Sequence, residues 1–477
     1  MVRLIALVVA VAAGTAAPAA AELRRSSCHV AGFETPVRCV ELDVPLDYAD
    51  PNGRSIAVMA AVVPATTARP APDPLFVFAG GPGQAGTDFG PWLQTAFAPV
   101  RRTRDVVLVD FRGTGRSGAL VCKSADFLGV AEPAAVRQVV RDCVSEHEPG
   151  LELYTHREVV EDIERLRVAL DLREINLWGG SFGTRIAQHY VRKYGAHVRS
   201  VVLDGATPVG ASIFATAPRT AEEALDRLLA DCAGDAGCAR SFPALRDDFA
   251  ALLERAEAGT LSGEIRRPDT GRLAQVALDR DGVVALVRGA MYVELTRALL
   301  PFAITEAARG RLEPLAALGA ATGEWATSTM ALGFTLGIVC SEDLAQSRRD
   351  DPANLSAGFV RDSYYRGFEL FCAEWPTAPV PAEMLAPIAS DVPALVISGE
   401  ADPVTPPSLG LATLAQFATR VHAIVPGGFH TNSSNRCVAS IIASFLADAA
   451  TGGRDHECLA QTALPPRFFV ADVTGDR

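Results

Sequence analysis

The chain has 477 residues, of which 49% are apolar and 21% are charged, and this composition excludes a disordered chain because enough apolar side chains are present to offset the entropy of ordering. No Gly-X-Y period or heptad repeat runs through it, which excludes collagen-like and coiled-coil proteins. The formal net charge of −12 argues against a nucleic-acid partner, since a protein that binds phosphate backbones needs a basic face.

The first 21 residues have the layout of a secretory signal peptide. Arg3 gives a positive start, residues 4–13 are an apolar run, and three alanines at 19–21 offer a cleavage site. The run is shorter than the roughly 20 apolar residues that a membrane-spanning helix needs. We therefore predict that residues 1–21 are removed and that the mature protein is secreted or periplasmic, with no membrane contact after cleavage.

Short apolar runs bounded by glycine, proline or aspartate recur along the chain, at residues 56–63, 75–80, 105–110, 175–178, 198–204, 394–398 and 422–425. Continuous runs of this length are typical of parallel strands that are covered on both faces. Helical patterns lie between them at residues 159–170, 182–194 and 438–449. This alternation predicts a mostly parallel central sheet flanked by helices.

The alternation breaks between about residues 207 and 387. Helical spacing dominates there, at residues 221–232, 245–258, 283–300 and 314–321, and no run suited to the central sheet follows until residue 394. We predict a mainly helical cap over 207–387, inserted between strands of one sheet. The two parts of the core would then be 22–206 and 388–477.

Ten cysteines in an exported chain indicate disulfides. No C-x-x-C motif occurs, and no Cys/His cluster has the spacing of a zinc site. Spacing does not determine connectivity, and buried free thiols are the alternative. The simplest pairing joins neighbours along the chain: Cys28 with Cys39, Cys122 with Cys143, Cys232 with Cys238, Cys340 with Cys372, and Cys437 with Cys458.

Residues 81–86 match the G-x-G-x-x-G pattern of a dinucleotide-binding loop and follow an apolar run. Pro82 removes a backbone N–H where a phosphate cradle needs donors, and an exported protein lies outside the pools of nicotinamide cofactor. The sequence has neither a G-K-[S/T] phosphate loop nor an H-E-x-x-H zinc motif. We therefore predict no cofactor and no metal.

The sequence GGSFG at residues 179–183 fits the G-x-S-x-G pattern, and it stands between a predicted strand and a predicted helix. That is the context of a nucleophile elbow, in which a tight turn exposes the serine at the start of a helix. Ser181 is therefore the predicted nucleophile. The alternative is a glycine-rich turn whose serine only caps the helix.

A serine nucleophile needs a base, and the base needs an acid to orient it. In this motif order the acid follows a late strand and the histidine follows the last strand, which predicts Asp402 and His430. Rival acids are Glu400 and Asp391, and the rival base is His422, which falls inside a predicted strand. For the oxyanion, the predicted donors are the backbone N–H groups of Phe182 and Gly81.

Taken together, the motifs resemble the α/β-hydrolase peptidases of the prolyl aminopeptidase class and their exported tripeptidyl-aminopeptidase-like branch. The resemblance rests on AGGPG at 79–83, DFRGTGRS at 110–117 and GGSFG at 179–183, and also on VPLDY at 44–48, YT at 154–155, LDG at 203–205, CSED at 340–343 and GEADPVTP at 399–406. It covers nearly the whole mature chain.

The resemblance implies an α/β-hydrolase fold and a serine hydrolase of the aminopeptidase type. Such an enzyme, prolyl or tripeptidyl in type, would cleave short peptides from a free N-terminus through an acyl-enzyme. An exported carboxylesterase or lipase with the same triad is the alternative. Two departures from the family pattern are Ala79, where a histidine is frequent, and Phe429, where a glycine usually precedes the histidine.

The resemblance also implies a place for the substrate's α-ammonium group. Cap carboxylates hold this group in the prolyl aminopeptidases, and Glu342 and Asp343 are the nearest candidates here. A buried ammonium needs a fixed negative charge, although a solvated acidic pair beside a disulfide would have the same sequence. Asp110 and Arg112 are expected to brace the oxyanion loop rather than touch substrate.

Overall fold

The computed structural model describes residues 23–122, 133–267, 270–347, 354, 358–450, 452, 456–462 and 466–470. The predicted signal peptide lies outside these residues. In the ranges that are described, no helix combines the length and the apolar character needed to cross a bilayer.

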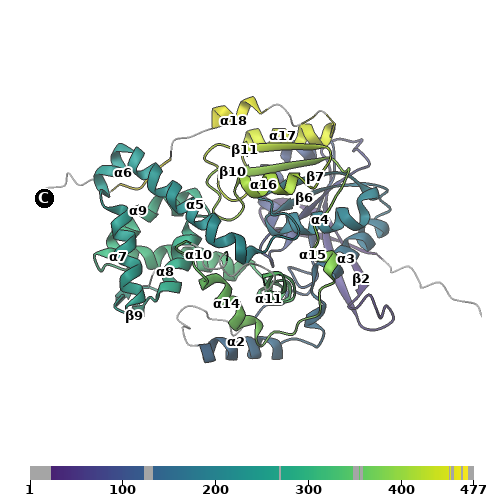
Figure 1. Cartoon of the computed structure of the whole chain (residues 1–477). Helices are drawn as coiled ribbons and strands as arrows, with labels where there is room; N and C mark the ends of the chain where they lie inside the picture. The colour runs from purple at the N-terminus through teal and green to yellow at the C-terminus, as the bar shows by residue number, and fades with distance from the viewer. Residues whose placement is uncertain are drawn as a thin grey trace, which may run out of the picture.

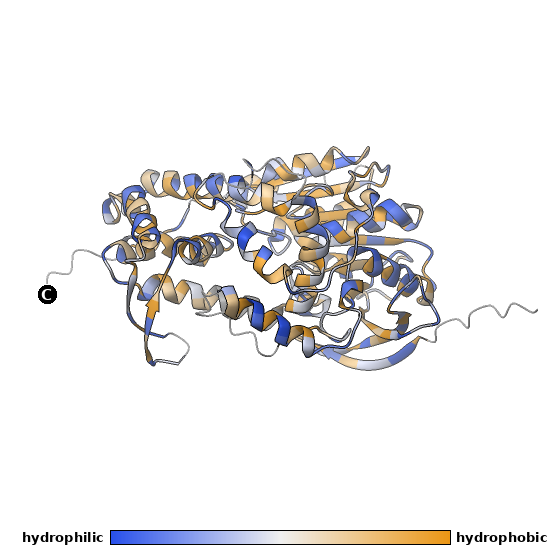
Figure 2. Cartoon of the chain, turned by 60° about the horizontal axis from the view of Figure 1, so that its bottom comes forward, coloured by the Kyte–Doolittle hydropathy of each residue, from blue (hydrophilic) through white to orange (hydrophobic). Residues whose placement is uncertain are grey.

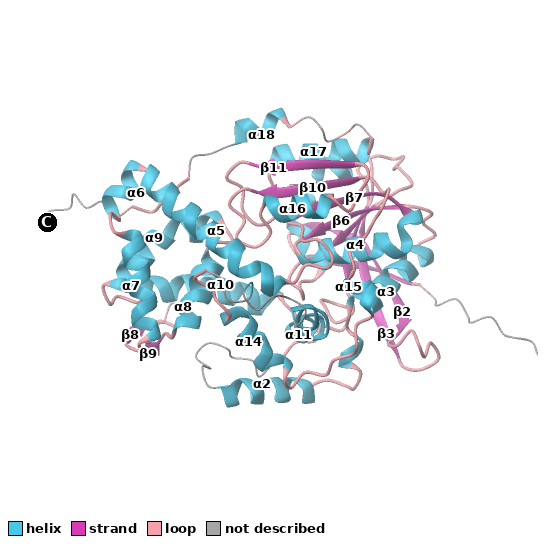
Figure 3. Ribbon diagram, viewed as in Figure 1, coloured by secondary structure: helices cyan, strands magenta, loops and turns pink. Residues whose placement is uncertain are grey.

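Nine strands of the described chain form one sheet in the order β1-β2-β3-β5-β4-β6-β7-β10-β11 (Figure 3). From β5 to β11 all neighbouring strands are parallel, whereas β1, β2 and β3 join the sheet antiparallel. The strands are β1 (Arg24–Val30), β2 (Phe33–Pro45), β3 (Ser55–Val63), β4 (Leu75–Phe78), β5 (Val106–Asp110), β6 (Ile175–Gly180), β7 (Val198–Asp204), β10 (Ala394–Gly399) and β11 (Arg420–Val425).

The mostly parallel sheet predicted from the apolar runs is confirmed, and all seven predicted runs are strands. The strands β1 and β2 were not predicted. Both lie at one edge of the sheet, where many of their side chains remain exposed, so they lack the continuous apolar run of a strand covered on both faces.

Side chains of the central strands alternate between two hydrophobic layers. In β4, Phe76 and Phe78 pack into one layer, and Leu75 and Val77 pack into the other. The first layer is covered by α3 (His156–Ala169), α4 (Phe182–Tyr194) and α16 (Pro407–Leu414), and the second by η1 (Gly86–Gln94), α1 (Ala98–Arg101), α17 (Arg436–Ala447) and α18 (Glu457–Thr462). The helices carry both hydrophilic and hydrophobic residues (Figure 2).

The helix α2 (Pro133–Ser145) and the short elements η2 (Leu151–Leu153) and η3 (Gly195–His197) also belong to the described part of the core.

Between β7 and β10 the chain leaves the sheet and forms a separate, mainly helical body beside it (Figure 1). We call residues 213–385 the cap; the domain boundaries at 207 and 387 remain predictions. Its elements are α5 (Ile213–Gly234), α6 (Ala236–Ser241), α7 (Leu245–Glu257), β8 (Ser262–Arg266), β9 (Leu273–Ala277), α8 (Arg280–Ala290), α9 (Glu294–Ala308), α10 (Glu313–Thr329), α11 (Leu332–Ile338), the π-helix η4 (Val339–Asp343), α12 (Leu344–Ser347), α14 (Ser363–Cys372) and α15 (Ala382–Leu385).

One helix predicted for the cap is divided into two helices in the structure. The helical pattern at 283–300 is broken at residues 291–293, between α8 and α9. The Thr296 hydroxyl donates to the carbonyl of Ala290 at 2.7 Å, and so satisfies an orphan carbonyl at the end of α8. The break places the ring of Tyr292 against that of His430, 5.4 Å away between centres.

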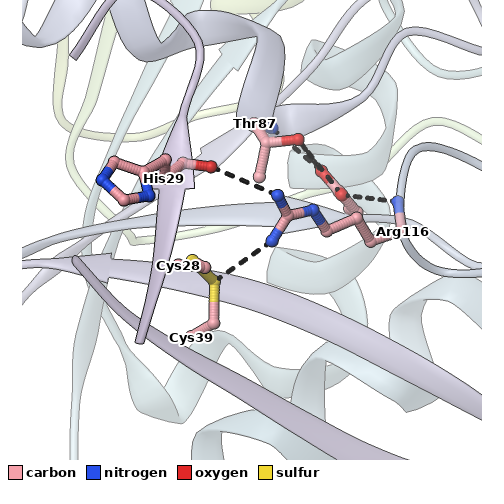
Figure 4. Close-up of a disulfide and its surroundings, with 6 residues drawn as sticks. Cys28, His29, Cys39, Thr87 and Arg116 are labelled. Carbon is pink, nitrogen blue, oxygen red and sulfur yellow. Dashed lines mark hydrogen bonds between the residues drawn. A yellow bond between two sulfur atoms is a disulfide. The ribbon is translucent and has the colours of Figure 1, made fainter. Parts of the chain in front are cut away.

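All five predicted disulfides are present. The pair Cys28 and Cys39 joins β1 to β2, and the guanidinium of Arg116 contacts both the Cys39 sulfur and the carbonyl of His29 (Figure 4). Within the cap, Cys340 of η4 is joined to Cys372 of α14. Each bridge therefore closes a local segment, as the neighbour pairing predicts.

Candidate active site

Ser181 lies in the turn between β6 and α4, and its φ is +52°. Glycines make this turn possible. A Cβ on Gly179 would stand 2.4 Å from the carbonyl oxygen of Gly183, and one on Gly183 would stand 2.2 Å from that of Phe78. Strand and helix therefore pass too closely for any side chain, and the strained turn presents the serine at the carboxyl edge of the sheet.

The structure brings the three predicted side chains into one contact chain. His430 Nε2 lies 2.8 Å from Ser181 Oγ, and His430 Nδ1 lies 2.8 Å from Asp402 Oδ2. Asp402 follows β10, and His430 follows β11. The carboxyl ends of these strands and of β6 meet at the same edge of the sheet. Such an arrangement can move a proton from the serine hydroxyl to the imidazole.

Asp402 is fixed by its own loop. Its Oδ1 accepts the backbone N–H groups of Val404 and Thr405 at 2.8 and 2.9 Å, and its Oδ2 accepts the Thr405 hydroxyl at 2.6 Å. Burial by itself would raise the pKa of Asp402, but the facing His430 and these hydrogen bonds outweigh it and lower the pKa. The carboxylate is therefore ionised and held toward the imidazole.

The pKa of the His430 imidazole is shifted in the opposite direction from that of Asp402. Burial by itself would lower the pKa of His430, but the charge and the hydrogen bond of Asp402 outweigh it, and the pKa is raised. Asp402 therefore stabilises the imidazolium that forms when the serine gives up its proton.

The sequence motifs include Asp204, at the end of β7, but do not indicate its role. Its buried carboxylate accepts the backbone N–H groups of Asn432 and Ser433 at 2.8 and 2.7 Å, and the Ser433 hydroxyl at 2.6 Å. Its backbone carbonyl accepts the N–H of Ser181 at 2.8 Å. One residue thus ties the turn of the nucleophile to the loop after His430, and burial raises the pKa of Asp204 to about 6.

The loop predicted to stabilise the oxyanion passes directly beside the nucleophile. A Cβ on Gly80 would meet the Cβ of Ser181 at 3.2 Å, and Gly81, with a φ of +111°, is exposed. Phe182 is the first residue of α4. One predicted donor thus follows Ser181 directly and the other follows Gly80, which lies beside Ser181. Their role in holding an oxyanion stays a prediction.

The cap holds this loop in place. The hydroxyl of Thr335, in α11, donates to the carbonyl of Pro82 at 2.6 Å, and the N–H of Ala331 donates to the carbonyl of Gly83 at 2.9 Å. Nothing in the sequence pattern pointed to this support, because it joins residues some 250 positions apart.

The rival acids and base are engaged elsewhere. Glu400 pairs with Arg227 at 3.2 Å, Asp391 is exposed, and His422 Nε2 lies 3.0 Å from Ser398 Oγ. Ser398 is completely buried in β10, so this second Ser–His pair is a packing contact inside the fold.

Asp110 and Arg112 brace the core. The buried Asp110 carboxylate accepts the N–H groups of Thr87 and Arg116, both at 2.9 Å, and so fixes the start of η1, which follows the oxyanion loop. Arg112 forms a buried bidentate ion pair with Asp162, at 2.7 and 2.6 Å.

The two carboxylates predicted for the substrate's ammonium group already have protein partners. Glu342 accepts the backbone N–H of His156 at 2.9 Å and contacts its Nδ1, while Asp343 pairs with Arg185 at 2.7 Å. Both carboxylates are buried. They join η4 of the cap to α3 and α4 of the core, and their contact with substrate stays a prediction.

In the described part of the chain, one group of side chains has the donors for a metal ion: His156, His189 and Glu342, whose ligand atoms lie within 4.8 Å of one another. All three are buried. However, His156 and Glu342 are hydrogen-bonded to each other, so these two donors would have to separate to admit an ion.

The sequence is similar to those of known hydrolases. Residues 73–434 match the sequence pattern of the protein family described as alpha/beta hydrolase fold. Serine protease Hip1 of Mycobacterium tuberculosis is 26% identical over an alignment of 476 residues that covers 88% of this chain and 87% of that protein.

Two further relatives match over shorter ranges. Carboxylesterase B of Mycobacterium tuberculosis is 30% identical over 227 residues, or 42% of each chain, and tripeptidyl aminopeptidase of Streptomyces lividans is 27% identical over 188 residues, or 35% of each chain. This chain therefore matches less than half the length of either protein. Because the family model spans most of the sequence and the elbow, the acid and the histidine lie on the strands that the fold requires, the chain belongs to the α/β-hydrolase fold family.

Proposed function

We propose that the protein is a serine hydrolase that cleaves peptides from a free N-terminus through an acyl-enzyme. The observation that carries this proposal is the contact chain from Ser181 through His430 to Asp402. The likeness to a serine protease along most of the chain, and to a tripeptidyl aminopeptidase along part of it, supports a peptide substrate.

In the first half of the reaction, Ser181 Oγ attacks the scissile carbonyl carbon while His430 Nε2 accepts the hydroxyl proton. The carbonyl oxygen becomes an oxyanion, which the N–H groups of Phe182 and Gly81 would stabilise. When the C–N bond breaks, His430 donates the proton to the leaving amine. In the second half a water molecule attacks the acyl-enzyme with the same histidine as base.

Asp402 stays ionised throughout. Its hydrogen bond to Nδ1 keeps the proton of the neutral ring on that nitrogen, so that Nε2 is free to act as the base. The hydrogen bonds from Val404 and Thr405 keep the carboxylate from turning away.

The predicted signal peptide and the five disulfides support a secreted or periplasmic location, since disulfides persist in oxidising compartments. Glu342 and Asp343 remain the proposed partners of the substrate's ammonium group, which would then have to share them with His156 and Arg185.

A carboxylesterase is the second candidate, because a carboxylesterase is among the relatives and the same triad cleaves esters. Three substrates separate the two functions: an aminoacyl anilide, the same anilide with an acetylated amine, and a short-chain ester. A peptidase that holds a free ammonium group should cleave the first and fail on the second, whereas an esterase should prefer the third.

The role of the nucleophile is tested by Ser181→Ala. Because the serine forms the covalent intermediate, we expect kcat to fall by about 10⁴-fold or more, with a residual rate from binding and the oxyanion donors. Ser26→Ala, at an exposed position of β1, is the matched control and should keep the activity of the unaltered enzyme. Full activity in Ser181→Ala would exclude the proposed mechanism.

A further inference from the structure

Arg288 has unusual surroundings for a charged side chain. It lies in the last turn of α8, a helix that begins at Arg280 after the N-cap residue Asp279. Its Cζ lies 4.8 Å from the ring centre of Tyr364 and 5.7 Å from that of Tyr292. The two rings thus border the guanidinium and limit its access to water, while their faces attract the cation.

Burial by itself would lower the pKa of Arg288, but Tyr292, Tyr364 and the more distant charge of Asp402 outweigh it and raise the pKa. In the described part of the chain this cation nevertheless has no ion-pair partner, and its Nε is buried with no hydrogen-bond partner. Three buried arginines are paired by contrast: Arg112 with Asp162, Arg185 with Asp343, and Arg297 with Asp231. An unpaired charge withdrawn from water is costly, and a bound anion would remove that cost.

Arg288 is also close to the triad. Tyr292 contacts both groups: its ring packs edge-on against the His430 ring, with 5.4 Å between centres, and its carbonyl accepts the N–H of His430 at 3.4 Å. The charge of Arg288 opposes the protonation of His430. One tyrosine therefore separates the guanidinium from the imidazole.

The position beside His430 identifies the part of the substrate that Arg288 would meet. His430 gives its proton to the leaving amine, so the leaving group lies on the imidazole side of Ser181. The oxyanion loop with Gly80 and Gly81 approaches Ser181 from β4, on another strand of the sheet. Arg288 lies behind Tyr292 on this imidazole side, where the first residue after the scissile bond would enter.

We propose that Arg288 binds a carboxylate of the leaving group, so that the preferred substrates carry a negative charge directly after the scissile bond. The planar fork of an arginine matches a carboxylate with two parallel hydrogen bonds. The carboxylate has two possible sources: the C-terminal carboxylate when the leaving group is a single amino acid, or an aspartate side chain in a longer one. This inference rests on the proposed peptidase function.

The test compares matched substrates that share one acyl part. One pair ends in alanine with a free carboxylate or with an amide, and the other has an amidated aspartate or an amidated asparagine after the scissile bond. For the unaltered enzyme we expect kcat/KM to be about 10- to 100-fold higher for the charged member of at least one pair, which corresponds to one charge-assisted hydrogen-bonded contact. The pair that shows the preference identifies the source of the carboxylate.

Variants then assign the preference to its residue. Arg288→Gln should reduce the ratio within the preferred pair to about 1, and Arg288→Lys, which keeps the charge but loses the fork, should retain part of it. Arg280→Gln, at the start of the same helix, is the control and should keep the ratio of the unaltered enzyme.

The outcomes separate this inference from the function on which it rests. If the unaltered enzyme cleaves none of the peptides, the proposed function fails. If it cleaves the peptides but shows no preference in either pair, the proposal for Arg288 is overturned whether or not the variants fold. A preference that survives Arg288→Gln also overturns it.

Discussion

At the scale of single residues, the site is organised by buried charges of opposite sign around one imidazole. Asp402 contacts the ring, Asp204 adds a second negative field, and Arg288 opposes both. Asp402 and Asp204 are also held by hydrogen bonds from their neighbouring loops. The same groups therefore position the histidine and set the pH at which it can act as a base.

The pH dependence of activity follows from this balance. Since Asp402 outweighs the effect of burial, the pKa of His430 is raised above its ordinary value of 6.5. Only the neutral ring can accept the serine proton, so kcat/KM should rise with pH and reach half its plateau above pH 6.5. A pH profile on the aminoacyl anilide measures this midpoint, and a value at or below 6.5 would contradict the assigned geometry.

The contribution of Asp204 can be measured in the same profile. Removing its charge with Asp204→Asn should move the midpoint to lower pH, because one of the fields that favour the imidazolium is lost. Asp391→Asn, at an exposed acid outside the site, should leave the midpoint unchanged.

At the scale of elements, the cap helix α11 acts on the core through the oxyanion loop. Thr335 and Ala331 bind two carbonyls of this loop, and a Cβ on Gly83 would meet the Thr335 hydroxyl at 2.8 Å. The loop therefore has little room to move, and the position of its N–H groups depends on a helix from another part of the chain.

Loss of this support should lower the rate more than it weakens binding. In Thr335→Val the shape is kept but the hydrogen bond to Pro82 is lost, and we expect kcat to fall about 2- to 10-fold with little change in KM, since one neutral hydrogen bond contributes about 1 kcal/mol. Thr335→Ser restores the hydroxyl and should restore kcat. A change confined to KM would show that α11 positions substrate rather than the oxyanion loop.

At the scale of the whole molecule, the cap is fastened to the core by neighbouring residues of η4. Glu342 and Asp343 reach α3 and α4 of the core, and the disulfide at Cys340 anchors the same helix to α14 within the cap. The C-terminal segment adds another connection, since the N–H of Phe469 donates to the carbonyl of Ala298 in α9. Cap and core should therefore unfold together.

The buried ion pair between Arg185 and Asp343 is the sharpest test of this attachment. Asp343→Ala leaves Arg185 buried without a partner, and we expect the free energy of unfolding to fall by about 3–5 kcal/mol. Glu223→Ala breaks an exposed pair with Arg219 in α5 and should cost less than about 1 kcal/mol. Denaturant titration measures both.

The same variant bears on the proposed role of Asp343 in substrate binding. If its main role is to hold the ammonium group, Asp343→Ala should raise KM for substrates with a free amine and leave stability unchanged. A loss of stability with equal effects on free and acetylated substrates would instead assign Asp343 to the attachment of the cap.

The sequence by itself determined the features that depend on near neighbours along the chain. Apolar runs predicted the central strands, helical spacing predicted α4 over its full length, and the order of turns after strands singled out Ser181, Asp402 and His430. The simplest pairing of the cysteines is also confirmed, since each bridge closes a segment between neighbours along the chain, although spacing by itself did not determine the connectivity. The edge strand β1 was not predicted, because most of its side chains are exposed.

Contacts between distant side chains depend on how the helices and strands pack in three dimensions. Asp204 binds a loop more than 220 positions away, Glu342 and Asp343 find partners in α3 and α4, and Arg288 lies one ring from His430. No local periodicity encodes these contacts, since they arise when helices from separate segments pack on one sheet. Burial explains the pairing, because a charged side chain that is removed from water is stable only when it is paired with another charge or binds a ligand.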